Sequence, residues 1–153
     1  MTETSQERIL TMARFTLPRD LYHGKGSLEA LKTFEGKRAM ICVGGGSMKK
    51  FGFLDRAVSY LKEAGMEVEL FEGIEPDPSV ETVMRGADAM LKFQPDWIIA
   101  IGGGSPMDSA KAIALLAVSD IERKNLFDGN IGNKALPMIH IPTTAGTGSE
   151  VTP

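Results

Sequence analysis

The feature that most constrains the fold of this chain is a regular alternation between short apolar runs and longer segments that are apolar along one face only. The short runs are typical of strands buried on both faces, and they occupy residues 38–43, 68–71, 97–101 and 138–141. The longer segments repeat apolar residues every three or four positions, as one face of a helix does, and they occupy residues 54–64, 80–91 and 106–118. Alternating strands and amphipathic helices predict right-handed crossovers and a mainly parallel sheet. We therefore expect an α/β fold, doubly wound, with helices on both faces of the sheet.

The residues before the first long apolar run predict smaller elements. Two short strands are expected at residues 14–17 and 21–23, followed by a turn at Gly24-Lys25-Gly26. Ser27 is expected to cap a short helix, whose apolar face carries Leu28, Leu31 and Phe34.

Charge and hydrophobicity exclude several classes of partner. The net charge is −3 and no run of lysine or arginine exceeds two residues, whereas nucleic-acid and anionic-membrane surfaces usually carry a basic patch. The polar N-terminus, MTETSQERIL, does not look like a secretion leader, and no stretch of about 18 apolar residues could span a membrane. We therefore expect a cytoplasmic protein with no nucleic-acid or membrane partner.

The cysteine content agrees with that compartment. Cys42 is the only cysteine, so the chain cannot form an internal disulfide, which suits a reducing cytoplasm. It lies within the apolar run Met40-Ile41-Cys42-Val43, which predicts a buried and chemically inert thiol.

Two of the predicted strands run directly into the same four residues, Gly-Gly-Gly-Ser. One copy is Gly44-Gly45-Gly46-Ser47 and the other is Gly102-Gly103-Gly104-Ser105. Glycines at a strand end allow positive φ and let a ligand approach the main chain without meeting a Cβ atom. Doubly wound sheets bind ligands at the carboxyl ends of their strands, where both copies lie.

The second copy is followed by a strong helix start. Ser105 suits the N-cap, Pro106 suits the first turn, and Asp108 stands where a capping box places its acidic residue. The helix would then direct free N–H groups and the positive end of its dipole toward the three glycines, which predicts a pyrophosphate site. The same residues also suit a plain strand-to-helix turn, and they differ from the common G-x-G-x-x-G fingerprint.

A third polar segment follows the last predicted strand. Residues 141–152, IPTTAGTGSEVT, contain five hydroxyl side chains and two glycines. Short donors on a flexible backbone suit the ribose and phosphate oxygens of a nucleotide, although a solvated polar loop would have the same composition.

These segments resemble those of a known family. Residues 102–111, GGGSPMDSAK, are similar to the GGGSxxDxAK signature of iron-containing (group III) alcohol dehydrogenases, and residues 142–152, PTTAGTGSEVT, are similar to their PTTxGTGSEVT segment. The Pro-Asp-Pro turn at residues 76–78 also fits. The resemblance covers essentially the whole chain as one dinucleotide-binding domain, residues 1–153. It implies the Rossmann-like N-terminal domain of the dehydroquinate synthase-like fold.

The resemblance implies an oxidoreductase that moves hydride between NAD(P)(H) and an alcohol or aldehyde. Gly103, Gly104 and Ser105 match positions that hold the pyrophosphate, and Asp108 matches a residue near the nicotinamide end. Three threonines match positions that contact the cofactor, namely Thr143, Thr144 and Thr147. Asp77 matches a position near the adenosine.

The first Gly-Gly-Gly-Ser copy bears on the choice of cofactor. NAD-preferring members of the family tend to carry an aspartate at the end of this strand, where a carboxylate would repel the 2′-phosphate of NADP. This chain instead has Gly44, Gly45 and Ser47, with Lys49 and Lys50 close by, as in NADP(H)-dependent butanol dehydrogenases and aldehyde reductases. We expect NADP(H) to be favoured over NAD(H); the two lysines suit either the phosphate or a solvated surface.

The family's metal, Fe²⁺ or Zn²⁺, is held by one aspartate and three histidines that follow the PTTxGTGSEVT segment. The sequence ends at Pro153, so we expect the metal-binding helical C-terminal domain, and with it any metal site or catalytic residue, to be absent from this chain. His23 and His140 lack ligand spacing and are expected to be buried or edge structural histidines.

Three questions stay open at the level of sequence. The substrate is not assigned, since its pocket would lie largely in the second domain. The family resemblance favours a homodimer, with a missing C-terminal domain as a further partner. Two alternatives to an enzyme half that is inactive alone are a stand-alone NADP(H)-binding regulatory module and a relative of the glycerol dehydrogenases.

Overall fold

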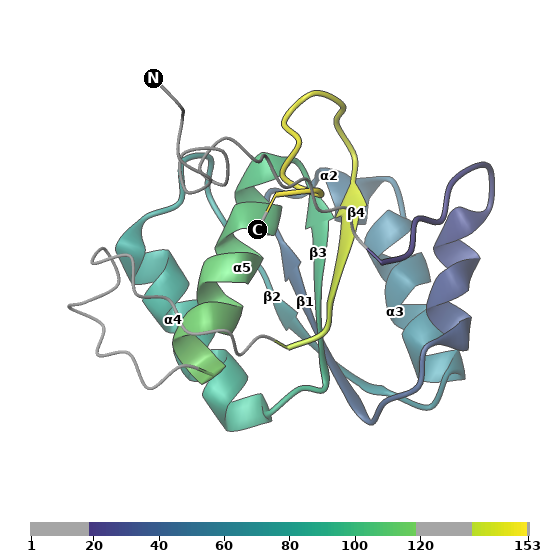
Figure 1. Cartoon of the computed structure of the whole chain (residues 1–153), viewed down its shortest axis with the longest axis horizontal. Coiled ribbons are helices and arrows are strands. Elements are labelled where there is room, and N and C mark those ends of the chain that lie inside the picture. The colour runs from purple at the N-terminus through teal and green to yellow at the C-terminus, as the bar shows by residue number, and fades with distance from the viewer. Residues whose placement is uncertain (1–18, 119–135, 153) are drawn as a thin grey trace, which may run out of the picture.

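The computed structural model describes residues 19–118 and 136–152, and these form a sheet between two layers of helices (Figure 1). The described strands are all parallel and lie in the order β2-β1-β3-β4. Their bounds are β1 Arg38–Val43, β2 Glu67–Phe71, β3 Trp97–Gly102 and β4 Met138–Pro142. All four predicted inner strands are therefore confirmed to within one residue, and so is the α/β class.

The helices divide between the two faces of the sheet, as a doubly wound fold requires. The 3₁₀ helix η1 (Ser27–Thr33) and α3 (Phe53–Glu63) cover one face, while α4 (Val80–Phe93) and α5 (Gly104–Val118) cover the other (Figure 1). A short helix, α2 (Ser47–Lys50), lies between β1 and α3. Gly65, with φ 85°, follows the last turn of α3 and ends the helix in the left-handed conformation that glycine adopts readily.

Two apolar clusters hold these layers together. Alternate residues of β1 and β3 point to opposite faces, so Met40 and Ile98 pack under α4 and α5, while Ile41 and Ile99 pack under α3. All four side chains are fully buried. Cys42 belongs to the first cluster, so the predicted burial of its thiol is confirmed; burial raises the pKa of this thiol to about 12, which disfavours the reactive thiolate.

One glycine sets how closely the two helices of the first cluster approach. Gly86 of α4 faces Ile113 of α5, and a Cβ atom on it would lie 2.7 Å from Ile113 Cγ1 and 3.1 Å from Phe71 Cε1. Ile113 is itself fully buried against the sheet, so it has little space into which to retreat. The spacing of the α4–α5 layer thus depends on the missing side chain at position 86.

We predict that Gly86→Ala lowers the free energy of unfolding by about 1 kcal/mol, since overpacking costs roughly 1–3 kcal/mol and the better helix propensity of alanine offsets about 1. Urea unfolding measures the difference. In an Ile113→Val background the penalty should shrink, because valine lacks the Cδ1 atom, which is the atom of Ile113 nearest to position 86. An equal penalty in both backgrounds would show that the crowding at Ile113 is not its cause.

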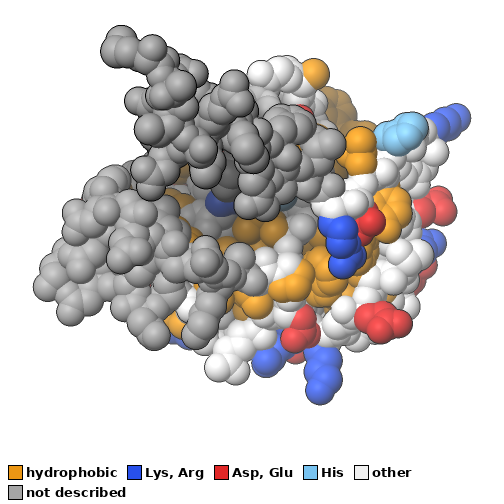
Figure 2. All heavy atoms as spheres, in the orientation of Figure 1, with side chains coloured by type: hydrophobic (Ala, Val, Ile, Leu, Met, Phe, Trp, Pro, Cys, Tyr) orange, Lys and Arg blue, Asp and Glu red, His pale blue; other side chains and the backbone are white. Residues whose placement is uncertain are grey.

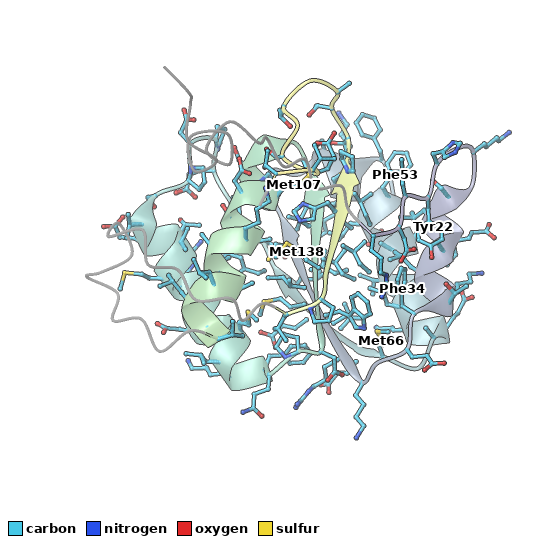
Figure 3. All side chains as sticks on the ribbon, in the orientation of Figure 1. Tyr22, Phe34, Phe53, Met66, Met107 and Met138 are labelled. Atoms are coloured by element: carbon cyan, nitrogen blue, oxygen red, sulfur yellow. The ribbon has the colours of Figure 1, made fainter. Side chains whose placement is uncertain are left out.

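The N-terminal part of the described chain differs from expectation. Residues 21–23 form no strand within the described structure and are exposed, and the strand predicted at 14–17 lies outside the described residues. Ser27 does not cap η1, because Gly26 precedes the helix with φ 85°. This segment is held by aromatic contacts instead. The Tyr22 and Phe34 rings (Figure 3) are 6.1 Å apart, and the Phe34 ring lies 5.1 Å from the Trp97 ring.

The outer strand β4 is less covered than β1 and β3. Its residues from Met138 to Ile141 are half-buried, and hydrophobic side chains reach the surface on the face seen in Figure 2. Within residues 19–118 and 136–152, no helix combines the length and apolar character needed to cross a membrane.

Candidate functional site

The candidate site lies at the carboxyl ends of the two central strands, at the top of Figure 1. After β1, the chain places β2 on one side, then crosses back to place β3 and β4 on the other. The β1–β3 boundary is therefore the point at which the strand order reverses, and open α/β sheets bind ligands in the crevice at such a point. Both Gly-Gly-Gly-Ser turns follow these two strands.

The second turn leads into α5 more tightly than the sequence suggests. Helix α5 begins at Gly104, so Ser105 lies within the first helical turn and is not the N-cap residue. Gly102 has φ 147°, and a Cβ there would lie 2.8 Å from Pro106 Cγ, so both the dihedral angle and the space require glycine. The N–H groups in the first helical turn of α5 have no partner within the helix and point out of its N-terminal end, where they can bind an anion.

In the first Gly-Gly-Gly-Ser turn, residues 44–47, the glycines have a different role from the one expected. None of the described glycines at 44–46 has a positive φ, so that expectation is wrong for this copy. Gly44 is instead a point of close approach, because its Cβ would lie 3.1 Å from the carbonyl oxygen of Ile74 and 3.3 Å from Pro106 Cγ. A Cβ atom built on Gly45 would have no neighbouring atom within 4 Å, and both Gly45 and Ser47 are exposed. The first turn therefore packs on one side and is open on the other.

The hydroxyl-rich loop after β4 lies against the second turn. Thr143 donates its N–H to the Gly102 carbonyl at 2.8 Å, which continues the strand pairing by one residue. A Cβ on Gly103 would lie 3.3 Å from Thr144 Oγ1, and one on Gly104 would lie 3.4 Å from Thr147 Cγ2. All three threonines are exposed. The structure thus brings together most of the predicted site residues, namely Gly103, Gly104, Ser105, Thr143, Thr144 and Thr147.

Asp108 is bonded to side chains rather than to a helix cap. Its Oδ2 accepts a hydrogen bond from Ser149 Oγ at 3.1 Å, and its Oδ1 accepts one from Lys111 Nζ at 3.3 Å. Ser149 and Lys111 were in the sequence motifs but were not predicted to belong to the site. The sequence gives a signal for Lys111 only, because it follows Asp108 by about one helical turn and can therefore reach its carboxylate. Ser149 is distant from Asp108 in the sequence and meets it only in the folded chain.

Asp77 lies on the loop between β2 and α4, which reaches the site through Ile74. Ile74 donates its N–H to the Val43 carbonyl at 3.4 Å, next to Gly44. Asp77 itself is exposed and has φ 52°, a left-handed conformation that aspartate tolerates better than most residues. The loop therefore borders the first Gly-Gly-Gly-Ser turn through Ile74.

A carboxylate near Asp77 organises this loop. Glu75 accepts hydrogen bonds from Ser79 N at 3.0 Å, from Ser79 Oγ at 2.9 Å and from Thr82 Oγ1 at 2.9 Å. Ser79 in turn caps α4 by accepting from Thr82 N at 3.2 Å. These donors, first among them the backbone N–H of Ser79, lower the pKa of Glu75 from its ordinary 4.5 to about 2.

This shift predicts a pH dependence of stability. A carboxylate whose pKa falls on folding stabilises the native state fully above its unfolded value of 4.5, and the contribution is lost as pH falls from there toward 2. Glu75→Gln should remove that component, so that the stability difference between wild type and variant shrinks below pH 4. Urea unfolding at pH 7, 4 and 3 measures it. Glu72→Gln, at an exposed neighbour on the same loop, is the control; a constant difference for Glu75→Gln would contradict the assignment.

The lysines and the two histidines singled out in the sequence lie on separate segments of the chain. Lys49 and Lys50 are exposed on α2. His23 is exposed just before the turn at residues 24–26, so the expectation of a buried or edge histidine is wrong for His23. His140 lies half-buried on β4; burial, helped by Lys111, lowers its pKa, while Asp108 and Glu150 act against that shift. Within the described ranges, no three His, Cys, Asp or Glu residues come together to hold a metal ion.

A parallel sheet in this order, with glycine turns at its reversal point, defines a Rossmann-like α/β fold of the kind that binds dinucleotides. Residues 18–153 match the family described as iron-containing alcohol dehydrogenase. The chain belongs to the iron-containing alcohol dehydrogenase family, which consists of oxidoreductases.

Individual relatives agree with that assignment. The chain is 57% identical over 148 residues to an NADPH-dependent butanol dehydrogenase of Clostridium saccharobutylicum, covering 92% of this chain and 37% of that protein. Among solved structures, an archaeal halo-thermophilic alcohol dehydrogenase from a Red Sea brine pool superposes with a TM-score of 0.81 at 39% identity, covering 93% of this chain and 39% of that one. The NADH-dependent butanol dehydrogenase A of Thermotoga maritima superposes with a TM-score of 0.83 at 30% identity, covering 92% and 36%. The chain thus spans less than two fifths of the length of these relatives.

Proposed function

We propose that this chain is the NADP(H)-binding part of an alcohol dehydrogenase or aldehyde reductase. One observation carries the proposal: two Gly-Gly-Gly-Ser turns and a threonine-rich loop meet at the reversal point of a parallel sheet, around the N-terminus of α5. Small residues, free backbone N–H groups and short hydroxyls are what a dinucleotide pyrophosphate and its riboses require. When bound, the nicotinamide ring would accept or donate the hydride exchanged with the alcohol or aldehyde carbon.

The chain's own residues divide the binding of such a cofactor among three segments. Gly103, Gly104 and Ser105 would hold the pyrophosphate at the start of α5, where the helix dipole favours negative charge. The exposed hydroxyls of the loop, Thr143, Thr144 and Thr147, would bind oxygens on its other side. Asp77 would lie toward the adenosine, because its loop borders the first turn, and Asp108 toward the nicotinamide.

The first turn supports NADP(H) over NAD(H). Gly44, Gly45 and Ser47 offer no carboxylate to repel a 2′-phosphate, and the open side at Gly45 leaves it space. Lys49 and Lys50 are exposed on α2, which begins at Ser47 of this turn, so two cationic side chains follow the turn directly. The 57% identical relative is named as NADPH-dependent, whereas the structural relative at 30% identity is named as NADH-dependent.

The family name implies iron, but the described residues do not fit a metal site. They contain no cluster of three ligand side chains, and His23 lies in the segment before η1 whereas His140 lies on β4. We therefore assign no metal ligand and no catalytic residue to them, and we propose that they bind and orient the cofactor without catalysing hydride transfer by themselves. The homodimer stays a prediction, and no substrate is assigned.

A calorimetric titration of this chain with NADPH, and separately with NADH, tests the proposal. We expect saturable binding of both, with the lower dissociation constant for NADPH. Gly103→Val should weaken binding of both cofactors by at least about tenfold, because a branched side chain would enter the space between the turn and Thr144 and displace the phosphate. Circular dichroism checks that the variant is folded. No binding of either cofactor to the wild-type chain would refute the proposed function.

A second prediction concerns the choice between the two cofactors. Gly45→Asp should raise the dissociation constant of NADPH relative to that of NADH by about tenfold or more, since like charges about 4 Å apart repel by roughly 1–4 kcal/mol. Position 45 suits this test better than position 44, where the Cβ itself would crowd Ile74 and Pro106. Gly45→Asn is the matched control, because it adds the same bulk without the charge. If the two variants behave alike, bulk rather than charge controls the preference.

A further inference from the structure

The loop of residues 143–152 is attached to the rest of the fold at its two ends. At its start, the Thr143 N–H is bonded to the Gly102 carbonyl at 2.8 Å. At its end, side chains of the loop bond to side chains of α5, 41 residues away in the sequence. Between these attachments lie Thr144 and Thr147, which face Gly103 and Gly104 across the candidate cofactor site.

The attachment at the end of the loop is a closed ring of hydrogen bonds. Lys111 Nζ donates to Thr152 Oγ1 at 2.7 Å, and Thr152 Oγ1 donates to the Ser149 carbonyl at 3.4 Å. Ser149 Oγ donates to Asp108 Oδ2 at 3.1 Å, and Lys111 Nζ closes the ring at Asp108 Oδ1. We call these four residues, Asp108, Lys111, Ser149 and Thr152, the loop clamp.

Two of the four clamp residues are shielded from water. Ser149 is 6% exposed and the Lys111 side chain 17% exposed, whereas the Asp108 side chain is 58% exposed and Thr152 is also exposed. Hydrogen bonds to charged groups are the stronger ones, and shielding from water strengthens them further. A buried serine hydroxyl and a largely covered lysine on the same carboxylate are therefore a stable anchor for an otherwise exposed loop.

The clamp also lies against the start of α5. Ser149 Oγ lies 3.2 Å from where a Cβ of Gly104 would be, so the hydroxyl rests on the bare backbone of the first helical turn. Ser149 N approaches Thr147 Oγ1 at 3.4 Å, which links the anchor to a threonine of the site. A shift of Ser149 along α5 would therefore move Thr147 relative to Gly104.

We propose that Lys111 and Ser149 are positioning residues, which hold the 143–152 loop at the distance from α5 that a dinucleotide requires. The proposal rests on the proposed function for the identity of the ligand, but the holding of the loop is a property of the free chain. Neither residue needs to touch the cofactor; they act through Asp108 and through the loop backbone.

Hydrogen–deuterium exchange of the ligand-free chain tests the holding of the loop. Lys111→Met and Ser149→Ala should each speed amide exchange of Ser149 and Val151, whose N–H groups donate hydrogen bonds within the loop, by about tenfold, roughly the effect of losing one hydrogen bond to a charged group. Exchange of β1 and β3 should not change. Lys111→Arg keeps the charge and several donors, so it should restore most of the protection. The matched controls are Lys62→Met and Ser59→Ala, both at exposed positions on α3.

Calorimetric titration with NADPH tests the positioning of the ligand. Lys111→Met and Ser149→Ala should raise the dissociation constant by about three- to thirtyfold, in step with the loss of loop protection, and Lys111→Arg should bind nearly as the wild type does. A merely structural role would lower thermal stability and speed exchange throughout the chain, without singling out this loop.

The outcomes separate the two proposals. Unchanged exchange of the Ser149 and Val151 amides in both variants would overturn the clamp, whatever the cofactor affinity. Faster exchange with unchanged NADPH affinity would overturn the positioning role. If the wild-type chain binds neither NADPH nor NADH, the proposed function fails, and with it the positioning of a dinucleotide, while the exchange data still decide whether the loop is held as described.

Discussion

The parallel pairing of β1 with β3 is the interaction on which the rest of the structure depends. Their residues pair from Ala39 with Trp97 to Val43 with Ile101, and nearly every side chain on them is buried on one face or the other. Because the two strands end in register, the glycine turns that follow them emerge side by side. A slip of this register would bury the wrong faces and would also separate the two turns. Core packing and site geometry are therefore set by the same contact.

Glycine serves two physical purposes in the two turns. At Gly102, the dihedral angle and the nearby ring of Pro106 both require it, so the turn can enter α5 at once. At Gly44, glycine is required only because the Ile74 carbonyl and the Pro106 ring leave little space for a Cβ atom. The Pro106 ring occupies the space next to both glycines, so it packs between the two turns that the sheet has brought together. The identical letters of the two copies conceal this difference.

Much of the fold could be predicted because its signals are local. A strand buried on both faces, such as residues 38–43, and a helix with a single apolar face need only neighbouring residues to be recognised. The position of Gly65 after α3 is likewise a local signal. The exposed stretch at residues 21–23 was misread as a strand, because its composition suits one but no described strand lies beside it. Strand formation depends on a partner, which a single segment does not reveal.

The site was predictable as a set of segments but not as a set of contacts. The motifs place Asp108 and the threonines together by resemblance, whereas the bonds of Ser149 and Lys111 depend on how β4 directs its loop back over α5. The anchoring of the Asp77 loop by Glu75 also depends on a helix cap four residues further along. Side-chain hydrogen bonds of this kind follow from three-dimensional placement, and composition alone favours a solvated loop.

The long sequence separation of the clamp has a consequence for the order of folding. Its bonds join residues 41 apart, and closing so large a loop costs entropy that only the completed β3–α5–β4 unit can offset. We therefore expect the 143–152 segment to be among the last parts of the described chain to become ordered, after the sheet has formed. The same separation lets it open locally while the buried strands stay intact, as ligand-binding loops commonly do.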